Sequence, residues 1–138
     1  MRLAIEDTDF GSKLETVKML LEYGSDINSK SHDGWTVLMS VCRYFSSNNN
    51  LLARLLLEYK PDVNIINTAG WTALMHAARY ASTESNIEIV KLLLDNNANI
   101  NLKNNDNYTA LMLACAVPNN LNTVRLLLKN GATINKKQ

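Results

Sequence analysis

The segment VKLLLDNNANIN at residues 90–101 decides the fold, because the chain contains it four times in slightly different forms. The other copies are VKMLLEYGSDIN (17–28), ARLLLEYKPDVN (53–64) and VRLLLKNGATIN (124–135). Their closing residues are Asn28, Asn64, Asn101 and Asn135, in steps of 36, 37 and 34 residues. A second series keeps the same register: GWTVLMSVC (34–42), GWTALMHAA (70–78) and NYTALMLAC (107–115). Two landmarks in one register indicate a repeat architecture.

Each unit is predicted to form two short helices joined by a turn. The threonine of the second series precedes an apolar stretch, where its hydroxyl can accept the first free N–H groups of a helix. The second helix contains the leucine triplets, and we expect their middle members, Leu56 and Leu93, to be buried between units. Leu127 belongs to the last unit, which lacks a neighbour on one side, so we expect it to stabilise the fold less.

The ends of the predicted second helices differ in their residues. Gly24, Asn97 and Gly131 tolerate the left-handed backbone conformation that commonly ends a helix. Lys60 stands at the equivalent position and is followed by Pro61, which favours an extended backbone in the residue before it. We therefore expect the helix that ends at Lys60 to close in a different way.

Length and composition limit the possible functions. The chain has 138 residues, of which 46% are hydrophobic, and this suffices for one folded domain. Its net charge of +1 lacks the basic excess that a duplex-binding protein needs, so we expect no nucleic-acid partner. The apolar runs are far shorter than the about 20 residues of a membrane helix, so we expect no membrane partner. Two cysteines make no disulfide scaffold, and we predict an intracellular, cytoplasmic protein.

The sequence lacks the side-chain patterns on which catalysis and metal binding depend. Neither His32 nor His76 is at metal-ligand spacing from another ligand, and there is no phosphate-binding glycine loop. Cys42 and Cys115 occupy the same repeat position two units apart, which is too far for a disulfide, and we expect two buried small hydrophobic residues. We predict that the protein is not an enzyme, with no catalytic, cofactor-binding or metal-binding residues and no cofactor.

This pattern resembles the ankyrin repeat, a unit of about 33 residues with a turn, two helices and a T-P-L-H-x-A signature. The resemblance implies an all-α ankyrin-repeat solenoid, in which helix-turn-helix units with β-hairpin fingers stack side by side. Four repeats are expected, the first of them truncated at its start: residues 1–30, 31–66, 67–103 and 104–138. The histidine of the signature is replaced by Met39, Met75 and Met112.

The units are longer than 33 residues, and the register places the extra residues between the two helices of each unit. These segments are FSSNNN (45–50), ASTESN (81–86) and PNNLN (118–122). We expect them to be mobile loops, because asparagine and serine bury little surface there.

The resemblance also implies a binding surface, since the fingers and first helices of an ankyrin stack line a concave face where partners usually dock. The residues of this chain at those positions are aromatic residues and arginines, which interface hot spots favour. They are Trp35, Arg43, Tyr44, Trp71, Arg79, Tyr80 and Tyr108. The two tryptophans have a second interpretation, because a tryptophan before the threonine is common in the family and can pack against the neighbouring finger.

The function implied by the resemblance is non-catalytic protein–protein interaction through the concave face. One alternative is an ankyrin-type inhibitor or regulatory subunit of an enzyme, including an effector directed at a host. Another is a structural spacer in a longer ankyrin array. The first unit starts inside a helix and no capping helix follows the last unit, so we expect a monomer or a fragment of a longer array.

Overall fold

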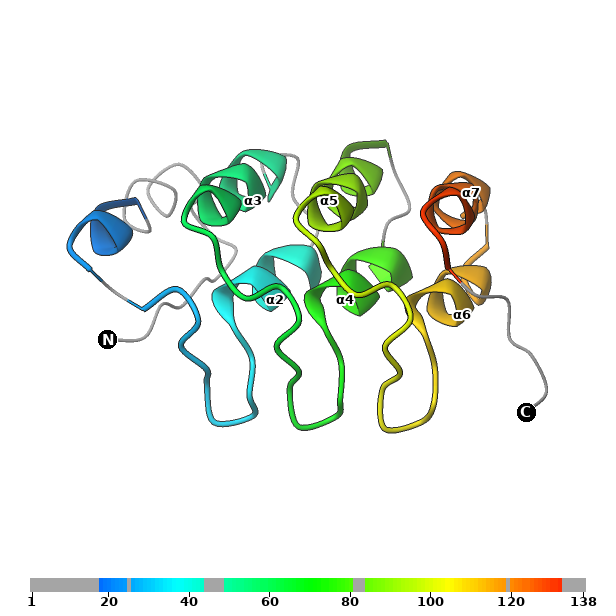
Figure 1. The fold of residues 1–138 in the computed structure, drawn as a ribbon, viewed down its shortest axis with the longest axis horizontal. Coiled ribbons are helices and arrows are strands. Elements are labelled where there is room, and N and C mark those ends of the chain that lie inside the picture. Colours follow the sequence, from blue (N-terminus) through cyan, green and yellow to red (C-terminus); the bar gives the residue numbers. More distant parts are fainter. Residues whose placement is uncertain (1–17, 25, 44–48, 81–83, 119, 133–138) are drawn as a thin grey trace.

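The computed structural model describes residues 18–24, 26–43, 49–80, 84–118 and 120–132. The helices are α2 (Val37–Arg43), α3 (Asn49–Glu58), α4 (Ala73–Tyr80), α5 (Glu84–Asp95), α6 (Ala110–Cys115) and α7 (Leu121–Lys129). Residues 18–22 are also helical, and none of the described residues lies in a strand. Figure 1 shows α2, α4 and α6 in one layer and α3, α5 and α7 in a second layer, with finger-like turns extending beyond the first. This is the all-α solenoid of stacked helix pairs that the sequence predicts.

The threonine caps are confirmed at all three first helices. The hydroxyl oxygen of Thr36 accepts the backbone N–H of Met39 at 3.2 Å, and that of Thr72 accepts the N–H of Met75 at 3.2 Å. Thr109 does the same for the third residue after it, at 3.3 Å. Each cap satisfies an N–H that the first turn of the helix leaves without a partner, so each first helix starts at one fixed residue.

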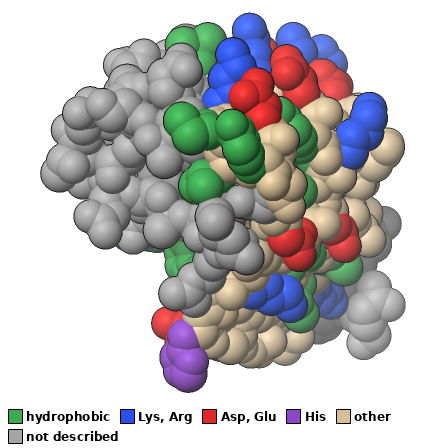
Figure 2. Space-filling model, turned by 90° about the vertical axis from the view of Figure 1, so that its left-hand side faces the viewer, with side chains coloured by type: hydrophobic (Ala, Val, Ile, Leu, Met, Phe, Trp, Pro, Cys, Tyr) green, Lys and Arg blue, Asp and Glu red, His purple; other side chains and the backbone are tan. Residues whose placement is uncertain are grey.

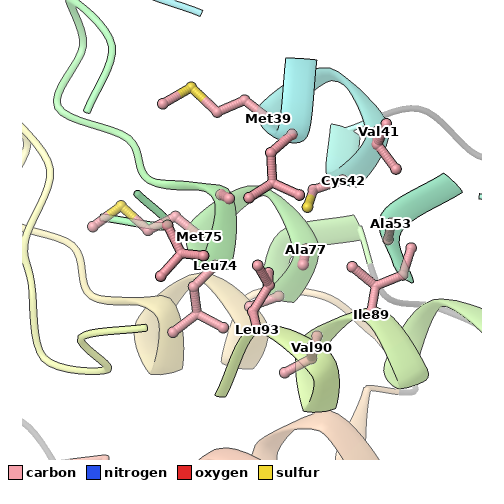
Figure 3. Close-up of a cluster of buried hydrophobic side chains, with 14 of the residues drawn as sticks. Met39, Val41, Cys42, Ala53, Leu74, Met75, Ala77, Ile89, Val90 and Leu93 are labelled. Carbon is pink, nitrogen blue, oxygen red and sulfur yellow. The ribbon is translucent and has the colours of Figure 1, made fainter. Parts of the chain in front are cut away.

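The hydrophobic core lies between the two helix layers and continues from one unit to the next. Leu56 of α3 and Leu93 of α5 have no exposed surface, as the prediction requires. Met39 and Met75, which stand where the ankyrin signature has histidine, are each only 1% exposed. Figure 3 shows Leu93 directed toward Ala77 of α4, whose small side chain lets the two helices approach closely. Thioether and aliphatic packing therefore hold each pair to its neighbour.

The prediction that Leu127 stabilises the fold less than Leu93 assumes that Leu127 is less buried. The structure does not show this difference. Leu127 is as fully buried as Leu93, because α7 packs against both α6 of its own unit and α5 of the preceding one. A difference in exposure appears at the next residue instead. Leu128 is 41% exposed, whereas Leu57 at the equivalent position of α3 is buried.

Two further predictions about single residues are wrong. Lys60 does adopt the left-handed conformation, with φ of 55°, and its N–H bonds to the carbonyl of Leu57, so Pro61 does not prevent this helix end. Cys42 is buried, but Cys115 is exposed. Its equivalents Cys42 and Ala78 are buried in helices that pack against the next first helix, and no described residue covers Cys115.

The prediction of loops that bury little surface fails at one described residue. Asn120 is only 5% exposed, and its side-chain amide donates to the carbonyls of Ala78 at 3.2 Å and Ala114 at 3.0 Å. It thus links the end of α4 to the end of α6. The helices α3, α5 and α7 begin inside the three predicted segments, and residues 45–48, 81–83 and 119 lie outside the described part of the chain.

Neighbouring fingers are joined by hydrogen bonds between their backbones. The N–H of Thr68 donates to the carbonyl of Asp33 at 3.0 Å, and the N–H of Asn105 donates to the carbonyl of Ala69 at 3.0 Å. The side-chain amide of Asn105 adds a bond to the carbonyl of Thr68 at 2.9 Å. These bonds run from one unit to the next, so they set the spacing of the fingers.

Asparagine side chains form a second set of hydrogen bonds between units, where the helix layers meet the fingers. The side-chain oxygen of Asn28 accepts the N–H of Asp62 at 2.8 Å, and that of Asn64 accepts the N–H of Asn99 at 2.7 Å. Both acceptors are closing asparagines of the repeat, so the residue that marks the period in the sequence also connects consecutive units.

The tips of the fingers leave no room for a side chain where another finger follows. Gly70 has φ of 80°, and a Cβ there would lie 2.8 Å from the backbone nitrogen of Asn105. Gly34 is in the same situation, with a Cβ 2.9 Å from the Cα of Asn67. The last finger carries Asn107 at this position, with φ of 68°. Asparagine tolerates that conformation, so Gly34 and Gly70 are required by the close approach as well as by the backbone angle.

We expect Gly70→Asn to destabilise the protein by about 1–3 kcal/mol, because the added side chain must push the next finger away. Asn107→Gly should change the stability by less than about 1 kcal/mol, since it removes a side chain from an open position. Urea unfolding followed by circular dichroism measures both. Similar losses for the two variants would show that finger contact contributes little.

We expect Leu93→Ala and Leu127→Ala to cost similar amounts, about 2–5 kcal/mol each, because the two side chains are equally buried. The same unfolding experiment tests this, with Leu128→Ala as a partly exposed control that should cost less. A much smaller loss at Leu127 than at Leu93 would mean that α7 frays from the end of the stack in solution.

Candidate functional site

The fingers orient their aromatic residues through side-chain hydrogen bonds at one repeat position. The side-chain oxygen of Asn67 accepts the N–H groups of Ala69 at 2.9 Å and Trp71 at 3.0 Å. The hydroxyl of Ser31 accepts the N–H of Trp35 at 3.2 Å in the preceding finger. Asparagine and serine side chains stabilise turns in this way. Trp35 and Trp71 therefore leave their fingers at equivalent points, one unit apart.

Both tryptophans pack against a single histidine of α4. The ring centroid of His76 lies 4.5 Å from that of Trp35 and 4.8 Å from that of Trp71, with the planes inclined at 35° and 33°. His76 is 4% exposed, and the tryptophans are half-buried. Tilted stacking at such distances is a favourable arrangement of aromatic rings. The tryptophans thus pack against a residue of a first helix, whereas the packing interpretation expects the neighbouring finger.

The environment of His76 keeps its imidazole neutral. Burial, with the positive charge of Arg43 as a smaller cause, lowers the pKa of His76 from 6.5 to about 4. Neither ring nitrogen has a hydrogen-bond partner among the described residues. A buried polar group without a partner costs about 1–3 kcal/mol, and functional sites are where such groups are commonly found.

Two arginines face one tyrosine beside these rings. The guanidinium carbon of Arg43 lies 4.1 Å from the ring centroid of Tyr80, and that of Arg79 lies 5.2 Å from it. Arg43 ends α2 and Tyr80 ends α4, so this contact joins two units. A guanidinium over an aromatic face is attracted by the ring.

These residues surround a shallow hollow of about 320 Å³ between two neighbouring fingers and the first helices. We call it the finger hollow. It is lined by Asp33, Trp35, Arg43, Asn67, Thr68, Ala69, Trp71, His76 and Tyr80. Four of its nine lining residues carry aromatic rings, and the lining includes one guanidinium and one carboxylate. Such a mixture suits the recognition of a side chain that has both an apolar and a charged part.

The structure brings together part of the predicted partner-binding set. Trp35, Arg43, Trp71 and Tyr80 line the finger hollow, and Arg79 contacts the ring of Tyr80 from outside the lining. Tyr108 is 50% exposed on the next finger and is not part of the hollow. Tyr44 lies outside the described residues.

Sequence reasoning placed His76 in a first helix but missed its role. Its equivalents are Ser40 in α2 and Leu113 in α6, so the repeat pattern itself gives no reason for a histidine. The available signal was the combination of an exceptional residue at one repeat position with tryptophans in two successive fingers. Stacking of those fingers brings both indoles to the same imidazole.

Other kinds of site find no support in the described residues. Within the described ranges, no group of three or more His, Cys, Asp and Glu side chains could hold a metal ion. No helix in the same residues is long and apolar enough to cross a membrane. Burial raises the pKa of the Cys42 thiol, which disfavours the reactive thiolate.

Comparison with protein families agrees with the fold. The family model described as Ankyrin repeats (3 copies) matches residues 2–104 and 47–138. These matches extend over nearly the whole chain, and the chain belongs to the ankyrin repeat family. Ankyrin repeats are generally protein–protein interaction modules, and the family is typically non-catalytic. A search of curated proteins found no match to this chain.

The buried imidazole predicts a pH dependence of stability. The pKa of His76 is lower in the folded state than the ordinary 6.5, so the unfolded chain takes up the proton first as the pH falls. Stability should be full above about pH 6.5 and decrease by up to about 3 kcal/mol as the pH approaches 4. His76→Leu, with the residue of the equivalent position in α6, should lack this component.

Urea unfolding of both proteins at pH values from 7 to 4 measures the difference. The carboxyl groups titrate in both proteins, so only the gap between the two curves reports on His76. Parallel curves would show that the imidazole is accessible to water when folded, against its burial in the structure.

Proposed function

We propose that the chain is a non-catalytic module that binds a protein partner through its concave face, with the finger hollow as the centre of the contact. The observation that supports this most is the gathering of two tryptophans, a tyrosine and an arginine around one hollow between neighbouring fingers. Tryptophan, tyrosine and arginine are the residues that most often dominate binding energies at interfaces.

The chemistry of the hollow favours a partner segment with a carboxylate next to an apolar or aromatic group. Arg43 and Arg79 lie against the ring of Tyr80, which holds the guanidinium groups in place before binding. An arginine held in this way loses little conformational freedom when it pairs with a carboxylate. The indoles of Trp35 and Trp71 offer flat apolar surface beside it.

The size of a stable interface requires more than one unit. Interfaces of standard size bury about 800 Å² on each partner, which exceeds what one finger offers. The proposed surface spans two neighbouring fingers and the ends of α2 and α4, and Tyr108 extends it along the next finger. A partner would therefore lie across the stack, with its strongest contacts at the finger hollow.

Arg79→Ala should weaken partner binding by about 1–3 kcal/mol while the melting temperature changes little, because a partly exposed arginine supports little of the fold. The partner is first captured with the wild-type chain and identified by mass spectrometry. Its affinity for each variant is then measured by isothermal titration calorimetry.

Arg54→Ala is the matched control, because it removes an arginine from α3 in the outer helix layer. It should leave the affinity unchanged. A loss of binding with Arg54→Ala and none with Arg79→Ala would place the partner on the outer helices and refute the proposed site. If the captured partner is an enzyme, its activity with and without the chain distinguishes an inhibitor from a simple binding module. The absence of any partner would favour a spacer in a longer array.

A further inference from the structure

The outer helix layer carries a second surface of different character. Between α5 and α7 lies a groove of about 430 Å³, larger than the finger hollow. Lys91 of α5 and both Arg125 and Lys129 of α7 line it, over a floor formed by Ile87 and Leu126. Asn122 and Glu88 complete the lining, and the carboxylate of Glu88 is paired with Arg54 of α3. The three cationic side chains are exposed, and the two apolar ones are half-buried. We call this surface the outer groove.

The repeat register explains why the outer groove is basic. Arg54, Lys91 and Arg125 occupy the same position in α3, α5 and α7, so they form a row across the outer layer. Arg54 is neutralised by Glu88 of the following helix, at 3.1 Å. The residue of α7 equivalent to Glu88 is Asn122. At this position α5, the outer helix after Arg54, has a carboxylate. The outer helix after Lys91, α7, has an amide there instead.

A second residue difference between α7 and the other outer helices also makes the outer groove more basic. Lys129 stands at the position occupied by Glu58 in α3 and Asp95 in α5. It follows Arg125 by four residues, so both cations lie on one face of α7. No ion pair joins Lys91, Arg125 or Lys129 to any other described residue. Asp95 follows Lys91 by four residues on α5 but does not line the groove.

Charged side chains gather on this side of the molecule, but with both signs present. Figure 2 shows lysine, arginine and acidic side chains together along the edge formed by the outer helices. The acidic members on α3 and α5 would repel a nucleic-acid backbone or an anionic lipid surface that extended beyond the groove. The net charge of +1 gives no broad attraction to either.

We propose that the outer groove binds an acidic segment of a protein, with carboxylates placed on both sides of one apolar side chain. The carboxylates would pair with Lys91 on one wall and with Arg125 and Lys129 on the other. The apolar side chain would cover Ile87 and Leu126 on the floor. This site is separate from the finger hollow and does not depend on the proposed function.

The test uses the full chain and two fluorescein-labelled decapeptides. The acidic probe is two copies of Glu-Glu-Leu-Glu-Glu, and the neutral probe has glutamine in place of every glutamate. Fluorescence anisotropy should show saturable binding of the acidic probe. The affinity should fall at least about tenfold when the NaCl concentration rises from about 50 to about 300 mM, because salt screens exposed charges.

The deciding variant is Arg125→Glu/Lys129→Glu, which should abolish binding of the acidic probe. Its matched control is Lys30→Glu/Lys103→Glu, two exposed lysines outside the groove. Each pair changes the net charge by −4, from +1 to −3, so general electrostatic attraction is reduced equally. The control should bind the acidic probe within about twofold of the wild-type chain at low salt.

Several results would overturn the inference. These are an equal loss of binding in both variants, equal affinity for the neutral probe, or no binding of the acidic probe up to about 1 mM. Capture of the chain by phosphatidylserine vesicles, without binding of the peptide, would mean a lipid surface instead. Loss of peptide binding with Arg79→Ala, but not with Arg125→Glu/Lys129→Glu, would place the peptide in the finger hollow. That result would refute the outer-groove proposal and leave the proposed function standing.

Discussion

The whole structure depends on how closely one finger can lie against the next. The carbonyl of Asp33 accepts a hydrogen bond from the backbone of the following finger, and Gly34 beside it has no room for a Cβ. This contact fixes the distance between units at the level of the backbone. The first helices then meet at a constant spacing, and small residues such as Ala77 and Ala78 allow them to pack. A helix pair that cannot bury its apolar face alone is stabilised by its neighbours.

Regular stacking also creates the site. Successive fingers present Trp35 and Trp71 at one unit of separation, and α4, which follows the finger of Trp71, provides a single imidazole for both. His76 contacts the indoles of both fingers and is only 4% exposed. Between two fingers it loses water and keeps its neutral form, with Arg43 as a second reason. The hollow is thus a property of two neighbouring units and of no single one.

The period, the threonine caps and the buried leucines could be read from the sequence because each depends on spacing along one chain segment. The packing of Trp35 on His76 could not, since it depends on which residues of different units meet. Lys60 shows the limit of a local rule, because the helix end takes the left-handed form despite the proline after it. Asn120 shows another, since a polar loop residue is buried once its amide links two helix ends.

The two surfaces of the stack follow from departures from its own repeat. A repeated unit with identical residues would place the same charges on every outer helix, and each cation would meet the next helix's carboxylate as Arg54 meets Glu88. Asn122 and Lys129 interrupt that pattern on α7. In the inner layer His76 interrupts it on α4. The regular positions account for the fold, so the chemistry of binding is to be sought at the positions where one unit differs from its neighbours.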